Sequence, residues 1–253
     1  MGDKTRPNQA VILAAGMGVR LSEIVTEYPK GFVELGSEAL LFRSIRLLQQ
    51  AGINSIIIVK GHQGDILEER LQKGFDGLCF VENPIYHASG SMHSLFVAAS
   101  EIDGDFLLLE SDLIYEYRAL QTILDAGEDT GILVSGATNA GDEVYVYGEN
   151  NNITDISKTC HPGKHILGEL VGISRLSLNF FRLMIDIYSR QEPFPSLHHY
   201  EEIIALAARQ RRTPAILVED LAWTEIDTPE HYERADNVIL PKIQANDRRF
   251  MED

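Results

Sequence analysis

A glycine-rich segment near the start of the chain has the residue types of a phosphate-binding loop. The segment is Leu13-Ala-Ala-Gly16-Met-Gly18-Val-Arg20-Leu, and it directly follows a short apolar run. Glycines at the carboxyl end of a strand let backbone N–H groups approach a phosphate, and the next helix adds the positive end of its dipole. Arg20 supplies a permanent, planar charge that suits a polyphosphate. The alternative is an ordinary glycine turn that carries a surface arginine.

The same segment excludes two common phosphate-binding motifs. The dinucleotide fingerprint requires a third glycine where Leu21 stands, and the lysine-Ser/Thr pair of the Walker loop is absent. The segment therefore predicts a phosphate loop of another class.

Lys30 is a candidate for a second cation at the same phosphates. It follows Pro29, whose ring fixes the backbone and limits where the Lys30 ammonium can go. A single lysine is usually a solvated surface residue. The short distance in sequence between Lys30 and the glycine-rich segment supports its interpretation as a phosphate ligand.

Asp112 and Asp227 are the candidate metal ligands. Asp112 follows the apolar run Phe106-Leu-Leu-Leu109, at a strand end, where open α/β sheets bind ligands. Asp227 stands just before a helix start predicted at Thr228-Pro229. Each aspartate could instead be an ordinary residue of a turn or of a helix N-terminus. Two carboxylates from distant strand ends, in a chain with a phosphate loop, fit Mg²⁺ better than either does alone.

Together with Tyr28-Pro-Lys30-Gly, the glycine-rich segment resembles the signature of the nucleotidyltransferases that make activated sugars and activated phospho-alcohols. The resemblance extends to about Tyr232. It implies an α/β sheet beneath a nucleoside triphosphate, with Arg20 and Lys30 as catalytic residues that engage the phosphates. The two aspartates would then hold Mg²⁺ as the cofactor. The nucleotide-binding residues that the resemblance implies are Leu13, Ala14, Ala15, Gly16, Met17, Gly18, Ser91 and Ser94.

Within that superfamily the match narrows towards the small cytidylyltransferases that act on phosphocholine and 2-aminoethylphosphonate. Five segments resemble stretches with which those enzymes bind the base and the acceptor: Asn83-Pro-Ile-Tyr86, Ser91-Met-His-Ser-Leu95, Asp142-Glu-Val-Tyr-Val-Tyr147-Gly, Glu169-Leu-Val-Gly-Ile173 and His199-Tyr-Glu-Glu202. Any of them could instead be turn or core sequence. The acceptor-binding residues that we expect are Glu143, Tyr200 and Glu201.

The chain departs from the choline pattern at one place. That pattern is similar to an Asn-Glu-Trp run before Tyr-Gly, whereas here Glu143 precedes Val144 and the stretch contains no tryptophan. A trimethylammonium group is best met by aromatic faces, but a primary ammonium needs hydrogen-bond acceptors. The departure therefore favours a primary amine as the acceptor's cationic end.

The predicted function is transfer of CMP from CTP to 2-aminoethylphosphonate, an anionic amino-phosphonate, with release of pyrophosphate. An acceptor phosphonate oxygen is already ionised, so positioning and charge neutralisation should dominate over base catalysis. Three alternatives stay open: a phosphocholine cytidylyltransferase, a sugar-1-phosphate nucleotidyltransferase, and a non-catalytic nucleotide-binding regulator.

The amino-acid composition indicates the general type of protein and its cellular compartment. The chain has 253 residues, 44% of them hydrophobic, and 38 acidic against 22 basic residues give a net charge of −16. An α/β domain of this length needs no disulfide or structural metal, and the isolated Cys79 and Cys160 suit a reducing compartment. We therefore expect a cytoplasmic protein. Its acidic surface argues against nucleic acid as a partner, and the short apolar run at Ala10 to Ala15 argues against a membrane segment.

The elements that must position these residues follow from the apolar pattern. Strands are predicted at 11–14, 55–59, 78–81 and 106–109, alternating with helices at 40–50, 65–72 and 92–100. Strands at 131–135, 143–147 and 153–156 have no room for helices between them and are expected to be antiparallel. Helices at 178–190 and 200–211 and strands at 215–218 and 223–226 precede the last helix, for which Thr228 is a plausible N-cap.

The expected fold is a three-layer α/β sandwich with a mixed, mainly parallel sheet, like that of the nucleotidyltransferases. We expect one domain over residues 1–243 and a charged, frayed tail over 244–253. Whether a further domain follows Asp253 stays open.

Overall fold

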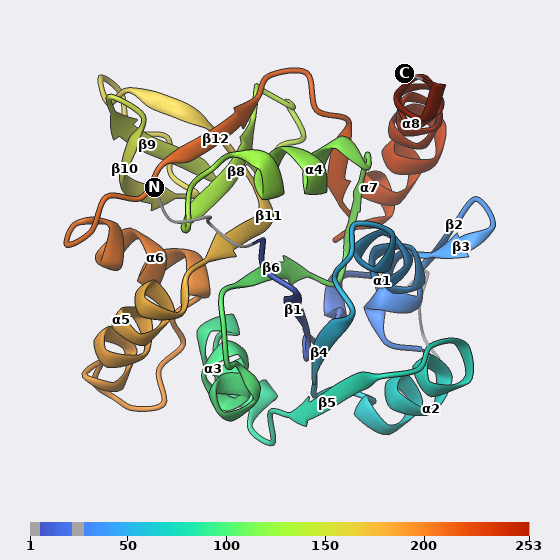
Figure 1. Cartoon of the computed structure of the whole chain (residues 1–253), viewed down its shortest axis with the longest axis horizontal. Helices are drawn as coiled ribbons and strands as arrows, with labels where there is room; N and C mark the ends of the chain where they lie inside the picture. Colours follow the sequence, from blue (N-terminus) through green and yellow to red (C-terminus); the bar gives the residue numbers. More distant parts are fainter. Residues whose placement is uncertain (1–5, 22–27, 253) are drawn as a thin grey trace.

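The computed structural model describes residues 6–21 and 28–252 of the chain (Figure 1). Within these ranges nine strands form one mixed sheet, in the order β10-β9-β11-β6-β1-β4-β5, and β8 joins it by pairing with β11 and β12. The strands are β1 Gln9–Ala14, β4 Ser55–Lys60, β5 Leu78–Glu82, β6 Phe106–Glu110, β8 Gly131–Ser135, β9 Tyr145–Glu149, β10 Asn152–Ser157, β11 Ile166–Leu176 and β12 Ala215–Val218. Two short ribbons lie outside this sheet: β2 Glu34–Leu35 with β3 Glu38–Ala39, and β7 Leu113–Tyr115 with β13 Trp223–Glu225.

The centre of the sheet is parallel, as the alternation of strands and helices predicts. β1 lies between β4 and β6 and runs parallel to both, with Val11 opposite Ile57 on one side and Leu108 on the other. Parallel strands end at the same edge of a sheet, and ligands bind at that edge. The carboxyl ends of β1 and β6 therefore bring the glycine-rich segment and Asp112 to one place.

β11 is the main strand that the sequence analysis did not assign. It pairs antiparallel with β6, β8 and β9. Two glycines and two charged residues interrupt its apolar pattern, and its register against β8 shifts between Leu170 and Ser174. Of the three strands that we expected to form an antiparallel group, β9 and β10 do pair in this way, whereas β8 pairs with β11 and β12 instead.

Helices cover both faces of the sheet, which confirms the three layers (Figure 1). The side chains of β1 alternate between the faces. Val11 and Leu13 share a buried cluster with α3, α5 and α6, and Ala10 and Ile12 share another with α1, α2 and α4. These helices are α1 Leu40–Gln50, α2 Gly64–Gly74, α3 Ser91–Val97, α4 Arg118–Asp125, α5 Leu178–Ser189 and α6 Tyr200–Ala208.

The end of the chain is helical where we expected a frayed tail. α7 spans Pro229–Arg234, a π-helical turn spans Ala235–Ile239, and α8 spans Leu240–Glu252. Ile239 and Ile243 are buried in a third apolar cluster with Leu21 and Ile226. One of the charged residues that suggested fraying has partners: Asp247 accepts hydrogen bonds from Tyr117 N at 2.8 Å and from Arg43 Nη2 at 3.0 Å. The frayed-tail expectation is thus wrong over 244–252.

The start of α7 agrees with the sequence prediction. The Thr228 hydroxyl accepts a hydrogen bond from His231 N at 3.3 Å and caps the helix, and Pro229 occupies the first helical turn. This cap fixes the chain immediately after Asp227.

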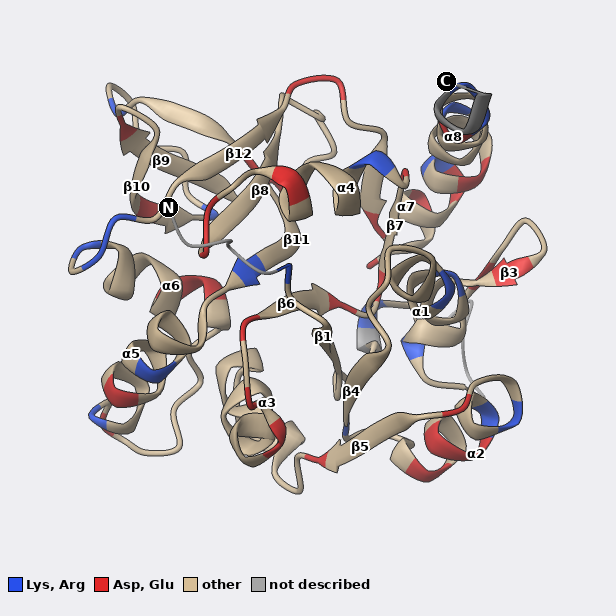
Figure 2. Cartoon of the chain, viewed as in Figure 1, with Lys and Arg blue, Asp and Glu red and all other residues tan. Residues whose placement is uncertain are grey.

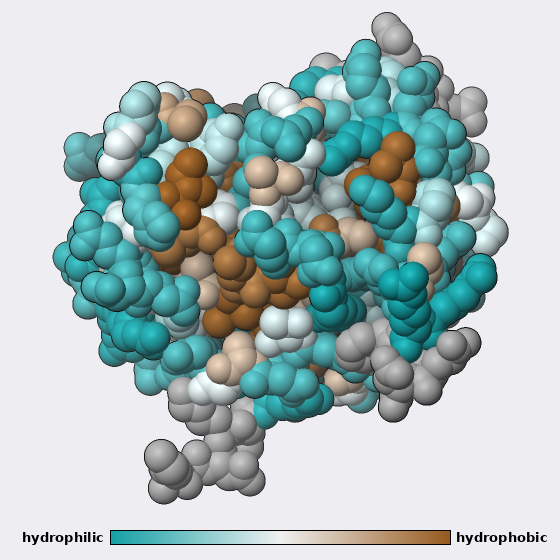
Figure 3. Space-filling model, turned by 90° about the horizontal axis from the view of Figure 1, so that it is seen from above, coloured by the Kyte–Doolittle hydropathy of each residue, from teal (hydrophilic) through white to brown (hydrophobic). Residues whose placement is uncertain are grey.

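Acidic residues lie on many elements, with lysines and arginines between them (Figure 2). The loop after α6 stands out as basic because Arg209, Arg211 and Arg212 follow one another closely there. On the face seen from above, most residues are hydrophilic and apolar ones show in patches (Figure 3). Among the described helices, none has the combined length and hydrophobicity needed to cross a bilayer.

Candidate active site

A cleft of about 430 Å³ opens at the carboxyl ends of β1 and β6. Most of the site residues predicted from the sequence line it. These residues are Leu13, Ala14, Ala15, Gly16, Met17, Gly18, Arg20, Lys30, Ser91, Ser94, Asp112, Glu201 and Asp227. Segments far apart in the sequence thus meet at one edge of the sheet, as the parallel topology requires.

Gly18 allows the glycine-rich segment to turn towards Lys30. Its φ is +59°, in the left-handed region that side chains other than glycine rarely adopt. A Cβ on Gly18 would also lie 3.2 Å from the Cβ of Lys30. The turn closes with a hydrogen bond from Leu21 N to Gly18 O at 3.0 Å. The loop and the lysine are therefore packed directly against each other.

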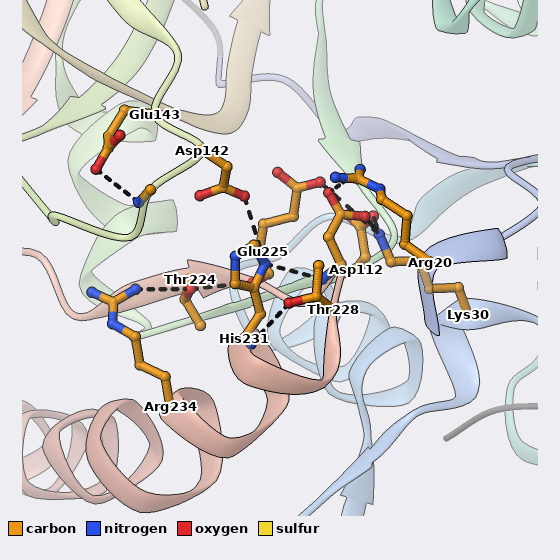
Figure 4. A network of polar contacts seen from close by, with 12 residues as sticks. Arg20, Lys30, Asp112, Asp142, Glu143, Thr224, Glu225, Thr228, His231 and Arg234 are labelled. Carbon is orange, nitrogen blue, oxygen red and sulfur yellow. Dashed lines mark hydrogen bonds and ion pairs between the residues drawn. The ribbon is translucent and has the colours of Figure 1, made fainter. Parts of the chain in front are cut away.

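Lys30 joins the two predicted metal ligands. Its ammonium donates to Oδ2 of Asp112 and to Oδ1 of Asp227, and it lies 4.0 Å from Oε1 of Glu225. Only 11% of the Lys30 side chain is exposed. Burial would lower the pKa of Lys30, but the surrounding carboxylates outweigh burial and raise it. Lys30 is thus held as a cation between the two aspartates (Figure 4).

Arg20 also contacts one of the two aspartates that Lys30 joins. Its Nη2 donates to Oδ2 of Asp227 at 2.5 Å, while 62% of its side chain stays exposed. Burial would raise the pKa of Asp227, but a hydrogen bond with Glu225 and the charges of Lys30 and Arg20 hold it at about 2. Asp227 is therefore ionised throughout the neutral range.

Two further carboxylates, Glu110 and Glu225, were not assigned from the sequence. Each stands two residues before a predicted metal ligand, in Glu110-Ser-Asp112 and in Glu225-Ile-Asp227. Both line the cleft. Burial raises the pKa of both groups, and their negative neighbours raise it further. The repeated Glu-x-Asp spacing was the sequence signal that could have identified them.

These carboxylates fit a hard divalent cation. Oxygen atoms of Glu110, Asp112 and Glu225 lie within 4.8 Å of one another, and so do those of Asp142, Glu225 and Asp227. Asp112 Oδ1 is buried and has no hydrogen-bond partner. A buried carboxylate oxygen without a partner is costly, and oxygen ligands are those that Mg²⁺ and Ca²⁺ prefer. The donor set and this unpartnered atom agree with metal binding at Asp112 and Asp227.

Tyr200 does not line the cleft, in contrast to the acceptor-binding role that we expected for it. Its side chain is 1% exposed, and its hydroxyl donates to Glu110 Oε1 at 2.8 Å. Gly172, with a φ of +79°, makes room for the other Glu110 oxygen, because a Cβ there would lie 2.8 Å from Oε2. Tyr200 and Gly172 thus hold Glu110 in place, whereas Glu201 faces the cleft.

Glu143 lies in a small side pocket of about 20 Å³ that adjoins the cleft. The two cavities share four lining residues: Val144, Leu170, Trp223 and Glu225. Glu143 Oε1 accepts a hydrogen bond from Gly141 N at 3.0 Å (Figure 4), and backbone hydrogen bonds of this kind lower the pKa of Glu143. Of the predicted acceptor residues, Glu201 therefore lines the cleft, Glu143 lines the side pocket, and Tyr200 lines neither.

Ser91 and Ser94 line the opposite wall, at the start of α3. Ser91 Oγ accepts from Tyr200 N at 3.1 Å and lies 3.2 Å from Nδ1 of His199. Ser94 Oγ accepts from Nδ2 of Asn83 at 3.1 Å. Both serines are thus anchored to segments that resemble base-binding and acceptor-binding stretches.

Lys158 and Trp223 are two lining residues that the sequence analysis missed. Lys158 follows β10, and it forms no ion pair with any carboxylate in the described parts of the chain. Trp223 is half-buried and lines both cavities, and its indole N–H donates to Ser135 Oγ at 2.8 Å. An exposed lysine after a polar strand carries no distinguishing signal in one sequence.

Curated relatives align with most of this chain. It is 26% identical to a bifunctional IPC transferase and DIPP synthase of Thermococcus kodakarensis, over 92% of this chain and 51% of the relative. The chain thus spans about half the length of that relative. A CTP:phosphoglutamine cytidylyltransferase of Campylobacter jejuni is 26% identical over 86% of this chain and 95% of its own length. A CMP-5'-(3-aminopropyl)phosphonate synthase of Streptomyces rubellomurinus is 24% identical over 93% of this chain and 39% of its own.

Solved structures share the fold. The inositol-1-phosphate CTP transferase from T. maritima superimposes with a TM-score of 0.81 at 18% identity, covering 97% of this chain and 98% of that one. The expected nucleotidyltransferase-like fold is thus confirmed. The family model of the MobA-like NTP transferase domain matches residues 10–162, which include the glycine-rich segment, Lys30 and Asp112. The chain therefore belongs to the family of MobA-like NTP transferase domains.

Proposed function

We propose that this chain transfers the cytidylyl group of CTP to 2-aminoethylphosphonate and releases pyrophosphate. The observation that carries the proposal is the convergence of the glycine-rich loop, Arg20, Lys30 and the two aspartates on one cleft. Relatives named as acting with CTP, or as making a CMP-phosphonate, support the choice of nucleotide and of acceptor class.

In this reaction the protein has to position the two substrates and to neutralise the negative charge of the phosphates. An ionised phosphonate oxygen attacks the α-phosphorus of CTP, and the bond from that phosphorus to the bridging oxygen breaks. Pyrophosphate leaves with the electron pair. Backbone N–H groups of the glycine-rich loop would bind the phosphates, and Arg20 and Lys30 would offset the charge that develops on pyrophosphate. Mg²⁺, held by Asp112 and Asp227, would neutralise further charge on the triphosphate.

Lys158 is the residue suited to the acceptor's anionic end. It lines the cleft and has no carboxylate partner in the described parts, whereas Lys30 and Arg20 are both paired with aspartates. An acceptor that carries a phosphonate needs a cation on its own side of the cleft. Lys158 would provide it.

The side pocket favours a primary ammonium over a trimethylammonium group. Its volume of about 20 Å³ suits a group of the size of one water molecule. Four carboxylates, those of Asp142, Glu143, Glu169 and Glu225, line it. A primary ammonium is of that size and donates three hydrogen bonds, whereas a trimethylammonium group is larger and donates none. The amine of 2-aminoethylphosphonate would enter this pocket beside Glu143.

The test is kcat/KM for 2-aminoethylphosphonate and for phosphocholine with CTP, followed by pyrophosphate release. We expect the wild type to prefer 2-aminoethylphosphonate, and Glu143→Gln to lose most of that preference while binding CTP as before. Glu149→Gln, an exposed glutamate on β9, is the matched control and should keep the preference.

Other outcomes point to the alternatives. A wild-type preference for phosphocholine would indicate a phosphocholine cytidylyltransferase. Turnover with UTP and a sugar 1-phosphate would indicate a sugar-1-phosphate nucleotidyltransferase. CTP binding without pyrophosphate release from any acceptor would indicate a regulator.

A further inference from the structure

The segment 136–144, between β8 and β9, forms one wall of the side pocket and has little backbone support of its own. At its start, Gly136 N donates to Glu219 O at 3.2 Å, and at its end Val144 O accepts from Leu170 N at 2.8 Å. Residues 137–143 are all described, and no hydrogen bond joins their backbone to another backbone group. The place of this segment therefore depends on side chains from other elements.

Thr138 is one of two points at which side chains of other elements hold this segment; the other is Asp142, whose Oδ2 lies 3.6 Å from Nδ1 of His231. The Thr138 N–H donates to Glu169 Oε2 of β11 at 3.0 Å, and its carbonyl accepts from Nη2 of Arg234 at 3.0 Å. Arg234 belongs to α7, and its Nη1 also donates to Thr224 Oγ1 of β13 at 3.4 Å (Figure 4). One guanidinium thus bridges the 136–144 segment and β13.

These two elements are the opposing walls of the side pocket. Thr138 and Glu143 line it from the segment, and Trp223, Thr224 and Glu225 line it from β13. Arg234 does not line either cavity. Because its rigid fork bonds one wall with each nitrogen, it sets how far apart the walls stand.

The charge of Arg234 also bears on the carboxylates of the pocket. Burial raises the pKa of Glu169, whereas hydrogen bonds from Thr138 and the positive charge of Arg234 oppose that rise. Hydrogen bonds from the backbone lower the pKa of Glu143, and Arg234 acts in the same direction. The guanidinium thus favours ionised carboxylates in the pocket without touching its contents.

We infer that Arg234 is a positioning residue for the acceptor: from α7 it holds the 136–144 segment against β13 and so sets the width of the side pocket. Its kinetic consequence rests on the proposed function, because it concerns binding of the acceptor amine. CTP binding should be independent of Arg234, because its hydrogen bonds go to Thr224 and Thr138 and none joins it to the described residues of the glycine-rich segment or of α3.

The kinetic test compares Arg234→Gln and Arg234→Lys with the wild type. Arg234→Gln should raise KM for 2-aminoethylphosphonate about tenfold, as expected for loss of a charge-assisted hydrogen bond, and leave KM for CTP within about twofold. Arg234→Lys keeps the charge and one donor, so it should recover part of the loss. Arg190→Gln, which changes an exposed arginine directly after α5 that pairs with Asp186, is the matched control for loss of one charge.

A second readout does not need turnover. Trp223 is the only tryptophan of the chain, and it lines the side pocket beside the bridge. Loosening of the 136–144 segment should expose its indole, so acrylamide should quench the fluorescence of Arg234→Gln more strongly than that of the wild type or of Arg190→Gln. Arg234→Lys should again lie between them.

The outcomes separate this inference from the proposed function. If the wild type turns over no acceptor, the proposed function fails, and Trp223 quenching alone decides the role of Arg234. Unchanged quenching in Arg234→Gln would overturn the inference, and so would equal rises in KM for CTP and for the acceptor. A lower kcat with both KM values unchanged would also overturn it, because that pattern reflects only a smaller folded fraction.

Discussion

At the scale of single residues, the site is organised around a lysine shared by two aspartates. Lys30 donates to both Asp112 and Asp227, and Arg20 adds a second cation at Asp227. The mutual repulsion of the aspartates is thereby offset by groups that also face the cleft. In the proposed reaction the same cations would turn to the triphosphate, because a lysine and an exposed arginine are flexible at their ends.

Replacing either aspartate should remove activity and spare the fold. Asp112→Asn and Asp227→Asn keep the shape of the side chain but remove an anionic ligand, so we expect kcat to fall about a hundredfold or more. Mg²⁺ should raise the Tm of the wild type, and this rise should shrink in both variants. Pyrophosphate release and thermal melts with and without Mg²⁺ measure the two effects. Turnover close to that of the wild type would refute the assignment of these ligands.

Arg20→Lys should lower the rate more than it weakens CTP binding. The variant keeps the charge but loses the planar fork, which should matter most as pyrophosphate departs. We expect kcat to fall about tenfold and the Kd for CTP to change by less than about threefold. Arg46→Lys, which alters a bidentate ion pair with Glu38 away from the cleft, is the control and should change neither value. An unchanged kcat would make Arg20 a surface residue only.

The residues that could be predicted from the sequence are those that belong to a recognisable motif. Arg20, Lys30 and Asp112 follow recognisable patterns, and all of them line the cleft. Lys158 could not be found in that way, because an exposed lysine after a polar strand has no distinguishing pattern. Glu110 was signalled only by the repeated Glu-x-Asp spacing. Tyr200 shows the reverse case: its type suited a binding site, but the packing of α6 turns its ring inwards.

At the scale of elements, β11 carries a conformational requirement next to the site. Gly172 has a positive φ, and a Cβ there would meet Glu110. Gly172→Ala should therefore lower the free energy of unfolding by about 1–3 kcal/mol and also reduce kcat, because Glu110 must move. Gly104→Ala is the control, since nothing lies within 4 Å of a Cβ at that position. Denaturant melts and pyrophosphate release test both parts, and equal stability of the two variants would contradict them.

The α3 helix carries a buried histidine that should make stability depend on pH. His93 is 8% exposed, stacks on Phe96 and lies near Tyr188 and Phe194, and its Nδ1 has no partner. Burial lowers the pKa of His93, so the unfolded chain binds a proton more readily than the folded one. The free energy of unfolding should therefore fall as the pH drops below the ordinary histidine pKa of about 6.5.

The variant His93→Phe isolates that contribution. A phenyl ring keeps the aromatic contacts but cannot be protonated, so the loss of stability between pH 7 and pH 5 should be smaller than in the wild type. His165→Gln changes an exposed histidine and should leave the wild-type profile as it is. Identical profiles for the wild type and His93→Phe would show that His93 does not contribute.

Periodicity was a good guide to elements with one uniform environment. The strands β1, β4 and β6 are buried on both faces, so their apolar runs are continuous and their bounds were nearly correct. β11 changes environment along its length and contains irregularities of register, which removed the signal. The helix α8 was not predicted for another reason: its stability comes from partners such as Tyr117 and Arg43, which are distant in sequence.

At the scale of the whole molecule, the parallel centre of the sheet decides where the cleft lies. Helical crossovers on both faces bring successive strands back in the same direction, so the loops after β1 and β6 meet. The antiparallel part, with β9, β10 and β11, adds the wall that holds the side pocket. The division between a nucleotide side and an acceptor side that we propose thus follows the division of the sheet.

The central place of β1 also constrains how the protein can be made. β1 leaves the ribosome first among the described strands, but its two neighbours are β4 and β6, and β6 begins only at Phe106. Until β6 has emerged, β1 can pair with β4 only. The glycine-rich segment also lacks the neighbouring strand end that carries Asp112. Long-range pairing of this kind is slow and leaves apolar surface exposed during synthesis. Nascent chains that stop before β6 should therefore depend on chaperones, and the cleft can be completed only after Asp227, which lines it, has emerged.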